Sequence, residues 1–135
     1  MKKSLFFVLI FIFVAQTFSQ TVPELIAPKN GAEISSESLI LSWEKYEGKT
    51  YQLQIATDTT FDSPVEVIIS DINGYVFKNL TSKLRYKKTY FWRVAFFTTS
   101  NTLEWSEVRS FTLGVYNFDT IKKGVKDFFK KAQKG

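Results

Sequence analysis

The chain has no cysteine and no histidine, and its 135 residues include three prolines and six glycines. Without cysteine it can form no disulfide, no thiolate metal site and no cysteine-linked lipid anchor. Without histidine it lacks the commonest proton shuttle, and neither a Ser-His-Asp nor a Cys-His catalytic arrangement can exist. These absences exclude a large part of enzyme chemistry, and we expect no cofactor.

The charge is divided unevenly along the chain. Hydrophobic residues make up 44% of the sequence, which is enough for one packed core, and the formal net charge is +5. Residues 20–115 hold ten basic and eleven acidic residues, a net charge of −1, whereas residues 116–135 hold six lysines and two aspartates, a net charge of +4. A nearly neutral body therefore precedes a basic tail, and the body gives no reason to expect a nucleic-acid partner.

The first residues have the pattern of a secretory signal. Two lysines precede the apolar run LFFVLIFIFVA at residues 5–15, and Thr17 and Ser19 provide small residues at a cleavage site. An uncleaved anchor is the alternative, but the run is short compared with the roughly 20 residues that a spanning helix needs. We expect residues 1–19 to be a signal peptide that is cleaved near Ser19, and the mature protein to be periplasmic, extracellular or at the cell surface.

Residues 20–114 are predicted to form a β-sandwich. Short apolar or β-branched runs alternate with turn residues, and the run YQLQIA at 51–56 alternates apolar and polar side chains as a half-buried strand does. The expected strands occupy residues 23–28, 39–43, 51–56, 65–69, 75–77, 89–98 and 108–113. Seven short strands at this spacing favour an all-β, antiparallel, seven-stranded sandwich.

The motifs of this body resemble a fibronectin type III domain of the bacterial secreted type. They are LSW at 41–43, YQLQIATD at 51–58, TYFWRV at 89–94 and WSEVRSF at 105–111. The resemblance implies a fibronectin type III or immunoglobulin-like sandwich with Trp43 between the sheets, and with Leu84 and Tyr90 forming a corner in which the tyrosine hydroxyl bonds to nearby backbone. It implies nothing about a ligand, because one fold carries many functions.

Alternation along residues 89–98 separates core residues from candidate binding residues. Tyr90 and Trp92, with Val94 and Phe96, are expected to face the core, whereas Phe91, Arg93, Ala95 and Phe97 are expected to face outward. Two exposed phenylalanines beside Arg93 would form a stacking surface for a sugar or a peptide. The alternative is that the basic tail covers them.

Two other groups of charged residues are candidate sites. The basic residues Lys83, Arg85, Lys87 and Lys88 either bind an acidic glycan, a phosphate or a polyanionic surface, or form a solvated loop. The carboxylate pairs Glu44/Glu47, Asp58/Asp62 and Glu104/Glu107 are expected at loops and strand ends, where they suit turns better than a glycosidase cleft. No calcium-loop spacing joins Asp58, Asp62 and Asp71, so neither catalysis nor a metal site is predicted.

Residues 115–135 are predicted to form a basic amphipathic helix. Its apolar stripe consists of Phe118, Ile121, Val125, Phe128, Phe129 and Ala132. Its lysines include Lys122, Lys123, Lys126, Lys130 and Lys131. A helix of this length is marginal in water by itself, so it needs a surface. Three are compatible with the sequence: its own sandwich, an anionic membrane or polymer, and a groove in a partner protein.

The sequence therefore predicts an exported, non-catalytic interaction module that binds a protein or glycan partner at or outside the cell envelope. The alternative is a structural envelope protein held at an anionic membrane surface by its C-terminal helix.

Overall fold

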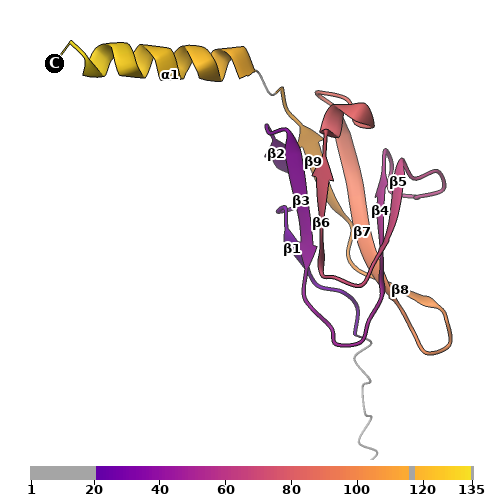
Figure 1. The fold of residues 1–135 in the computed structure, drawn as a ribbon. Coiled ribbons are helices and arrows are strands. Elements are labelled where there is room, and N and C mark those ends of the chain that lie inside the picture. The colour runs from indigo at the N-terminus through magenta and orange to yellow at the C-terminus, as the bar shows by residue number, and fades with distance from the viewer. Residues whose placement is uncertain (1–20, 116–117, 135) are drawn as a thin grey trace, which may run out of the picture.

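The computed structural model describes residues 21–115 and 118–134, except for the side chains of residues 118–121. The predicted signal peptide at residues 1–19, with its cleavage near Ser19, lies outside the described residues, as do the side chains of Phe118 and Ile121. Over the described range the chain forms two β-sheets packed face to face, followed by one helix (Figure 1).

The two sheets differ in size. The smaller sheet has the strand order β1-β3-β6, and its strands are β1 (Leu25–Ala27), β3 (Ser38–Trp43) and β6 (Gly74–Lys78). The larger sheet has the order β2-β9-β7-β4-β5, with β8 paired to β7. Its strands are β2 (Ala32–Ile34), β4 (Tyr51–Ala56), β5 (Glu66–Ser70), β7 (Thr89–Phe97), β8 (Leu103–Trp105) and β9 (Arg109–Leu113). The 3-10 helix η1 (Leu80–Ser82) and the α-helix α1 (Phe118–Ala132) complete the described elements.

The predicted β-sandwich is confirmed, but two of its details were wrong. Residues 21–115 contain nine strands rather than seven, because β2 and β8 are three residues each and are too short to show alternation. β2 also runs parallel to β9, with Ala32 opposite Phe111, whereas an entirely antiparallel sandwich was expected. The cause is that the first segment changes sheets at the turn around Gly31, so β2 runs beside the last strand in the same direction.

The core lies between the sheets and is rich in aromatic side chains. Trp43 of β3 and Trp92 of β7 are fully buried, as are Tyr51 and Tyr90 to within 2%. The Trp43 and Tyr51 rings meet edge to face at 5.4 Å, and the Tyr90 and Phe111 rings stack at 5.8 Å between centroids. Each large apolar side chain buried in this way contributes about 1.5–3 kcal/mol. Trp43, Leu84, Tyr90 and Trp92, the core residues named from the sequence, all lie here.

Two tyrosine hydroxyls fix loops to this core. The Tyr90 hydroxyl accepts a hydrogen bond from the backbone N–H of Arg85 at 2.8 Å, which is the corner that the resemblance implied. The Tyr51 hydroxyl accepts from the N–H of Tyr46 at 2.7 Å and donates to the carbonyl of Tyr46 at 3.1 Å. Loops at both ends of the sandwich are therefore tied to buried rings.

α1 begins five positions after the end of β9. The N–H of Gly114 still donates to the carbonyl of Ile34, at 2.9 Å. After Gly114 the chain leaves the sandwich, and α1 extends to one side of it, away from both sheets (Figure 1). The sandwich and the helix are thus two distinct parts of the described chain.

Replacing Tyr90 with Phe is expected to lower the free energy of unfolding by about 1–3 kcal/mol, because the Arg85 N–H loses its partner while the ring keeps its packing. Urea unfolding of the variant and the parent protein measures the difference. Tyr86→Phe is the matched control, because Tyr86 is 44% exposed. An equal loss in both variants would contradict the assigned role of the Tyr90 hydroxyl.

Candidate functional site

Helix α1 presents an apolar stripe to solvent. Val125, Phe128 and Phe129 are 50%, 69% and 60% exposed, and they lie on one face because residues three and four apart are neighbours on a helix. The two phenylalanine rings contact each other edge to face, with 5.8 Å between centroids. Large apolar side chains gathered in this way on an exposed helix are typical of a surface that meets another apolar surface.

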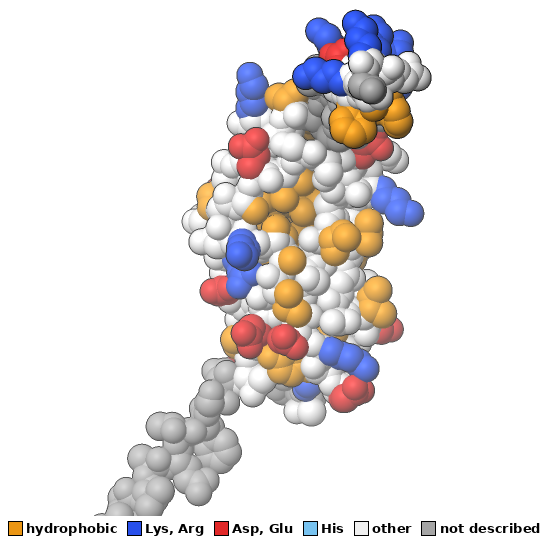
Figure 2. Space-filling model, turned by 90° about the vertical axis from the view of Figure 1, so that its left-hand side faces the viewer, with side chains coloured by type: hydrophobic (Ala, Val, Ile, Leu, Met, Phe, Trp, Pro, Cys, Tyr) orange, Lys and Arg blue, Asp and Glu red, His pale blue; other side chains and the backbone are white. Residues whose placement is uncertain are grey.

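The lysines of α1 occupy the rest of its surface. Lys122, Lys123, Lys126, Lys130 and Lys131 are all exposed. Figure 2 shows the basic side chains of the helix on one side and hydrophobic side chains on the other. No helix in the described part of the chain is both long enough and apolar enough to cross a membrane. The exposed apolar and basic side chains of α1 thus lie on different faces of the helix.

The predicted basic cluster lies at the end of the sandwich from which α1 leaves. The N–H of Lys87 donates to the carbonyl of Leu113 at 2.6 Å, and the N–H of Leu113 donates to the carbonyl of Lys88 at 3.0 Å. The loop that carries the cluster is thereby fixed to the last residue of β9. The basic cluster is therefore at the end of the sandwich from which the chain continues to α1.

The members of the cluster are not equivalent. Lys83 forms an ion pair with Glu66, and the hydrogen bond to that carboxylate raises the pKa of Lys83. Arg85, Lys87 and Lys88 are exposed, and no carboxylate of the described residues lies within ion-pair distance of them. Three cations of the cluster are therefore available to an anionic ligand.

Arg93 does not form the predicted stacking surface with Phe91 and Phe97. Its guanidinium lies 3.9 Å from the ring centroid of Trp105 and 4.2 Å from that of Phe61. Its Nε and Nη2 donate to Oε1 of Gln54 at 3.0 and 2.9 Å, and burial lowers its pKa. Since both faces of the guanidinium are occupied, Arg93 mainly holds the outer face of the larger sheet together.

The other residues predicted to face outward differ in how exposed they are. Phe91 and Phe97 are half-buried, and α1 does not cover them, because it extends away from the sheets (Figure 1). Ala95 is fully buried, contrary to the prediction. Its strand neighbours are Trp105 on β8 and Gln52 on β4, and these larger side chains shield a side chain as small as alanine.

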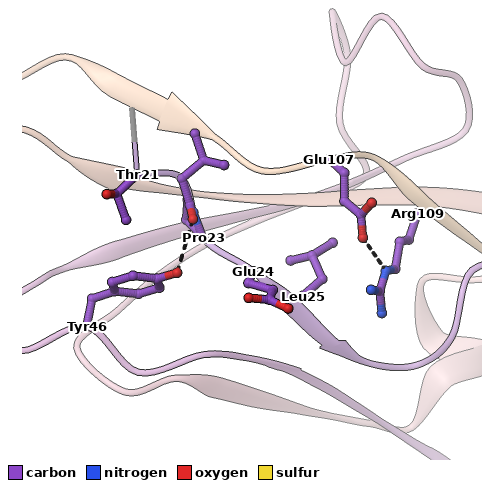
Figure 3. Close-up of a pocket in the computed structure, with 8 residues that line it drawn as sticks. Thr21, Pro23, Glu24, Leu25, Tyr46, Glu107 and Arg109 are labelled. Carbon is purple, nitrogen blue, oxygen red and sulfur yellow. Dashed lines mark hydrogen bonds and ion pairs between the residues drawn. The ribbon is translucent and has the colours of Figure 1, made fainter. Parts of the chain in front are cut away.

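A groove of about 630 Å³ lies at the opposite end of the sandwich, beside the first described residues (Figure 3). Glu24, Tyr46, Glu107 and Arg109 provide its polar groups. The Tyr46 hydroxyl donates to the carbonyl of Val22 at 3.2 Å, and Arg109 Nε donates to Glu107 Oε1 at 2.7 Å. These contacts are made within the fold.

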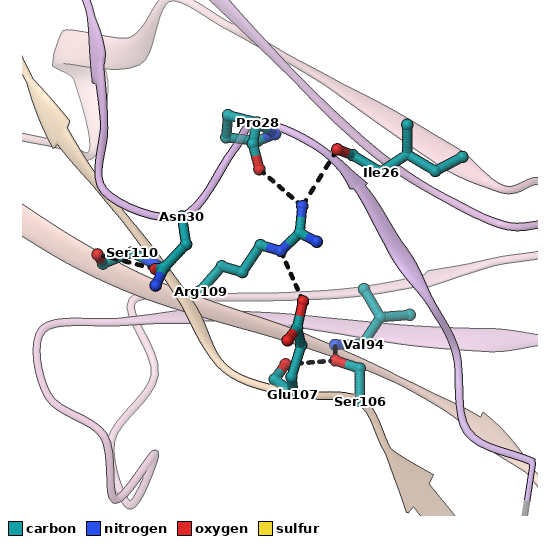
Figure 4. Close-up of polar contacts among 8 residues, drawn as sticks. All are labelled: Ile26, Pro28, Asn30, Val94, Ser106, Glu107, Arg109 and Ser110. Carbon is teal, nitrogen blue, oxygen red and sulfur yellow. Dashed lines mark hydrogen bonds and ion pairs between the residues drawn. The ribbon is translucent and has the colours of Figure 1, made fainter.

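Arg109 joins the first segment of the chain to the last strand. Its Nη1 donates to the carbonyls of Ile26 and Pro28 at 3.1 and 3.2 Å (Figure 4). Nearby, Ser106 Oγ accepts from the N–H of Val94 at 3.0 Å and donates to the carbonyl of Glu107 at 2.7 Å. Tyr46, Glu107 and Arg109 of the groove are therefore bonded to other groups of the fold.

Five of the six paired carboxylates lie in loops, and Glu104 is the middle residue of β8. Asp58 Oδ1 accepts hydrogen bonds from the hydroxyl and the N–H of Thr60, which lower the pKa of Asp58. Glu47 pairs with Lys45 at 2.8 Å, and Glu107 pairs with Arg109. Among the described residues no group of three or more acidic side chains could hold a metal ion.

Sequence reasoning missed the residues that hold Arg93. Gln54 could have been predicted as a partner of Arg93 from the pairing of β4 with β7, in which the two residues lie directly opposite each other. Phe61 and Trp105 come from a loop and a short strand whose positions depend on tertiary packing. No local pattern indicates such contacts.

Replacing Arg93 with Lys is expected to lower the free energy of unfolding by about 1–2 kcal/mol, because lysine keeps the charge but loses the planar stacking and the paired hydrogen bonds. Urea unfolding measures the difference. The exposed Arg85→Lys is the control and is expected to change little. An Arg93→Lys variant as stable as the parent would contradict the role assigned to the stack.

Comparison with known proteins places this sandwich in a family. The model of Rha78A-like N-terminal immunoglobulin domains matches residues 27–117. No curated protein matches the chain in sequence. The match spans all of the described strands except the beginning of β1.

Solved structures with a similar fold include enzymes and isolated modules. An α-L-rhamnosidase from Dictyoglumus thermophilum is 17% identical with a TM-score of 0.49, over 67% of this chain and 12% of that protein. A human fibronectin type III domain, from fibronectin type III domain containing protein 3, is 22% identical with a TM-score of 0.49, over 70% of this chain and 86% of that domain. CopC from Methylosinus trichosporium OB3b is 12% identical with a TM-score of 0.45, over 70% of this chain and 96% of that protein.

The family match confirms the predicted fibronectin type III or immunoglobulin-like fold. It covers well over half of the chain and includes Trp43, Tyr90 and Trp92, on which the core is built. The chain belongs to the family of Rha78A-like N-terminal immunoglobulin domains.

Proposed function

We propose that this protein is an exported, non-catalytic interaction module that acts at or outside the cell envelope. In this proposal the sandwich is a rigid body and α1 is the element that binds. The ligand class predicted from the sequence is a protein or a glycan, and an anionic membrane surface is the alternative.

The exposed stripe of α1 is the observation that carries the proposal. Val125, Phe128 and Phe129 leave half or more of their surface in water, although the helix is connected to a sandwich with a complete core of its own. Exposing such side chains costs free energy that a partner surface would recover. A role in binding accounts for this arrangement.

The arrangement of the polar groups supports a non-catalytic role. General acid–base catalysis needs titratable groups that converge on a cleft. In the described residues the carboxylates of Asp58, Glu47 and Glu107 are each engaged by a hydroxyl or a cation of the fold. Arg109, the cation that lines the groove, donates to backbone carbonyls.

The N-terminal sequence supports export. Its two lysines, apolar run and small residues before Gln20 have the order that signal peptidases recognise. The absence of cysteine is compatible with an oxidising compartment, since the sandwich is held by its core and its hydrogen bonds.

The second candidate function is attachment to a membrane surface through α1. The observation that favours it is the combination of an exposed apolar stripe with exposed lysines on the remaining faces of the same helix.

The intact mass of the protein recovered after expression in a bacterial host tests export. We expect a chain that begins at Gln20, because Thr17 and Ser19 occupy the small-residue positions of the cleavage site. Ser19→Arg, which removes the small residue, is the control and should leave the leader attached. A parent protein that keeps Met1 would contradict cleavage.

Ending the chain at Val115 tests the role of α1. Because the stripe is exposed, removal of the helix is expected to change the thermal midpoint by less than about 2 °C, whereas loss of a packed helix would cost about 4–8 °C per kcal/mol in a domain of this size. The truncated protein is also expected to leave the cell-envelope fraction and become soluble.

Two results would contradict the proposal. A fall of the midpoint by several degrees would show that α1 belongs to the core. An unchanged distribution between envelope and soluble fractions would show that α1 is not the binding element.

A further inference from the structure

We propose that α1 and the basic loop at the same end of the sandwich form one binding site for the surface of an anionic lipid bilayer. The site consists of the stripe Val125, Phe128 and Phe129, the lysines of α1, and the loop cations Arg85, Lys87 and Lys88. The inference rests on the proposed function, since it names what α1 binds, and it adds a second contact on the sandwich.

The pattern of α1 fits the interface between lipid headgroups and acyl chains. At about 100° per residue, Lys122 and Lys126 border one side of the apolar stripe and Lys131 borders the other. Lysines in these positions can extend their ammonium groups to the phosphates while the phenylalanines enter the acyl region. In this arrangement the helix would lie in the plane of the surface, because its apolar and basic side chains occupy different faces along its length.

The sandwich places three more cations close to the start of the helix. The N–H of Lys87 donates to the carbonyl of Leu113 at 2.6 Å, and the N–H of Leu113 donates to the carbonyl of Lys88 at 3.0 Å. These two hydrogen bonds fix the loop at the end of β9. Four residues separate Leu113 from Phe118, so the Cα atoms of these two residues are at most about 18 Å apart. Tyr86, which is 44% exposed among these cations, has the apolar ring and polar tip that suit a membrane interface.

Most of the net positive charge at this end of the protein is carried by the tail that contains the helix, so the helix is expected to contribute most of the attraction to an anionic surface. Residues 116–135 carry a net charge of +4. On the sandwich, Lys83 is paired with Glu66, and the carboxylates of Glu33 and Glu37 belong to strands and loops at the same end. The loop cations therefore add to the attraction and orient the sandwich, but they are too few to bind a bilayer alone.

An anionic bilayer fits these features better than a second copy of the chain. Two tails of net charge +4 would repel each other when their apolar stripes met. A partner protein would need an apolar groove bordered by acidic side chains on both sides, whereas a bilayer rich in anionic lipid provides both properties along any direction of the helix.

Vesicle sedimentation with the mature chain, residues 20–135, tests the proposal. Vesicles of phosphatidylcholine containing about one-third phosphatidylglycerol are compared with vesicles of phosphatidylcholine alone. We expect binding to the anionic vesicles, weakening as salt is added, and little binding to the neutral ones. Phe128→Ser with Phe129→Ser, and replacement of the five lysines 122, 123, 126, 130 and 131 by Gln, are each expected to abolish binding.

A matched pair of double variants tests the loop. Lys87→Gln with Lys88→Gln is expected to weaken binding about tenfold, since each cation near an anionic surface contributes up to about fivefold. Lys45→Gln with Lys49→Gln removes the same charge from the loop between β3 and β4, at the opposite end of the sandwich (Figure 1), and is expected to leave binding nearly unchanged. Thermal unfolding of every variant checks that the sandwich is folded.

Each contrary result has a definite meaning. Equal losses in the two double variants would show attraction by net charge alone and would overturn the single site. Equal binding to neutral and anionic vesicles, or binding that survives loss of the α1 lysines, would overturn the lipid proposal. If no vesicle binds but the chain ending at Val115 still leaves the envelope fraction, the partner is a protein or glycan, and the proposed function stands without this inference.

Discussion

The packing of aromatic side chains between the two sheets is the interaction on which the structure depends, because the chain has no cysteine for a disulfide and its described residues offer no group of metal ligands. Trp43 and Trp92 are fully buried at its centre, and their indole N–H groups find no hydrogen-bond partner among the described residues. An unsatisfied buried donor costs about 1–3 kcal/mol. The fold tolerates two unsatisfied indole N–H groups because burial of the two rings removes a large apolar surface from water.

The sequence was sufficient to predict the architecture because alternation and turn chemistry act locally. In the strands that contain Leu53 and Val94, buried and less buried side chains alternate with a period of two. Because the core requires large apolar side chains at the buried positions, this alternation is visible in the sequence. β2 and β8 were missed because three residues carry no period. Ala95 was misplaced because alternation gives the face of a sheet, whereas exposure depends on the size of the neighbouring side chains.

The candidate site was predicted in two pieces whose relation only the fold shows. The helix was predicted because its apolar spacing is local. The basic loop was predicted from composition, but its position beside the end of β9 depends on hydrogen bonds between residues that are more than twenty positions apart, such as Lys87 and Leu113. The aromatic partners of Arg93 were not predicted for the same reason, since Phe61 and Trp105 are distant from Arg93 in sequence and meet it through the tertiary fold.

The described chain enters the sandwich beside Tyr46 and leaves it at Gly114, which lie at opposite ends (Figure 1). β7 connects these two ends with nine residues, a length of about 30 Å. The sandwich is therefore a spacer of fixed length between residue 21 and the end from which the chain continues to α1. If α1 lies on a surface, the distance of a reporter group at residue 21 from that surface would reveal whether the domain is upright or lies flat.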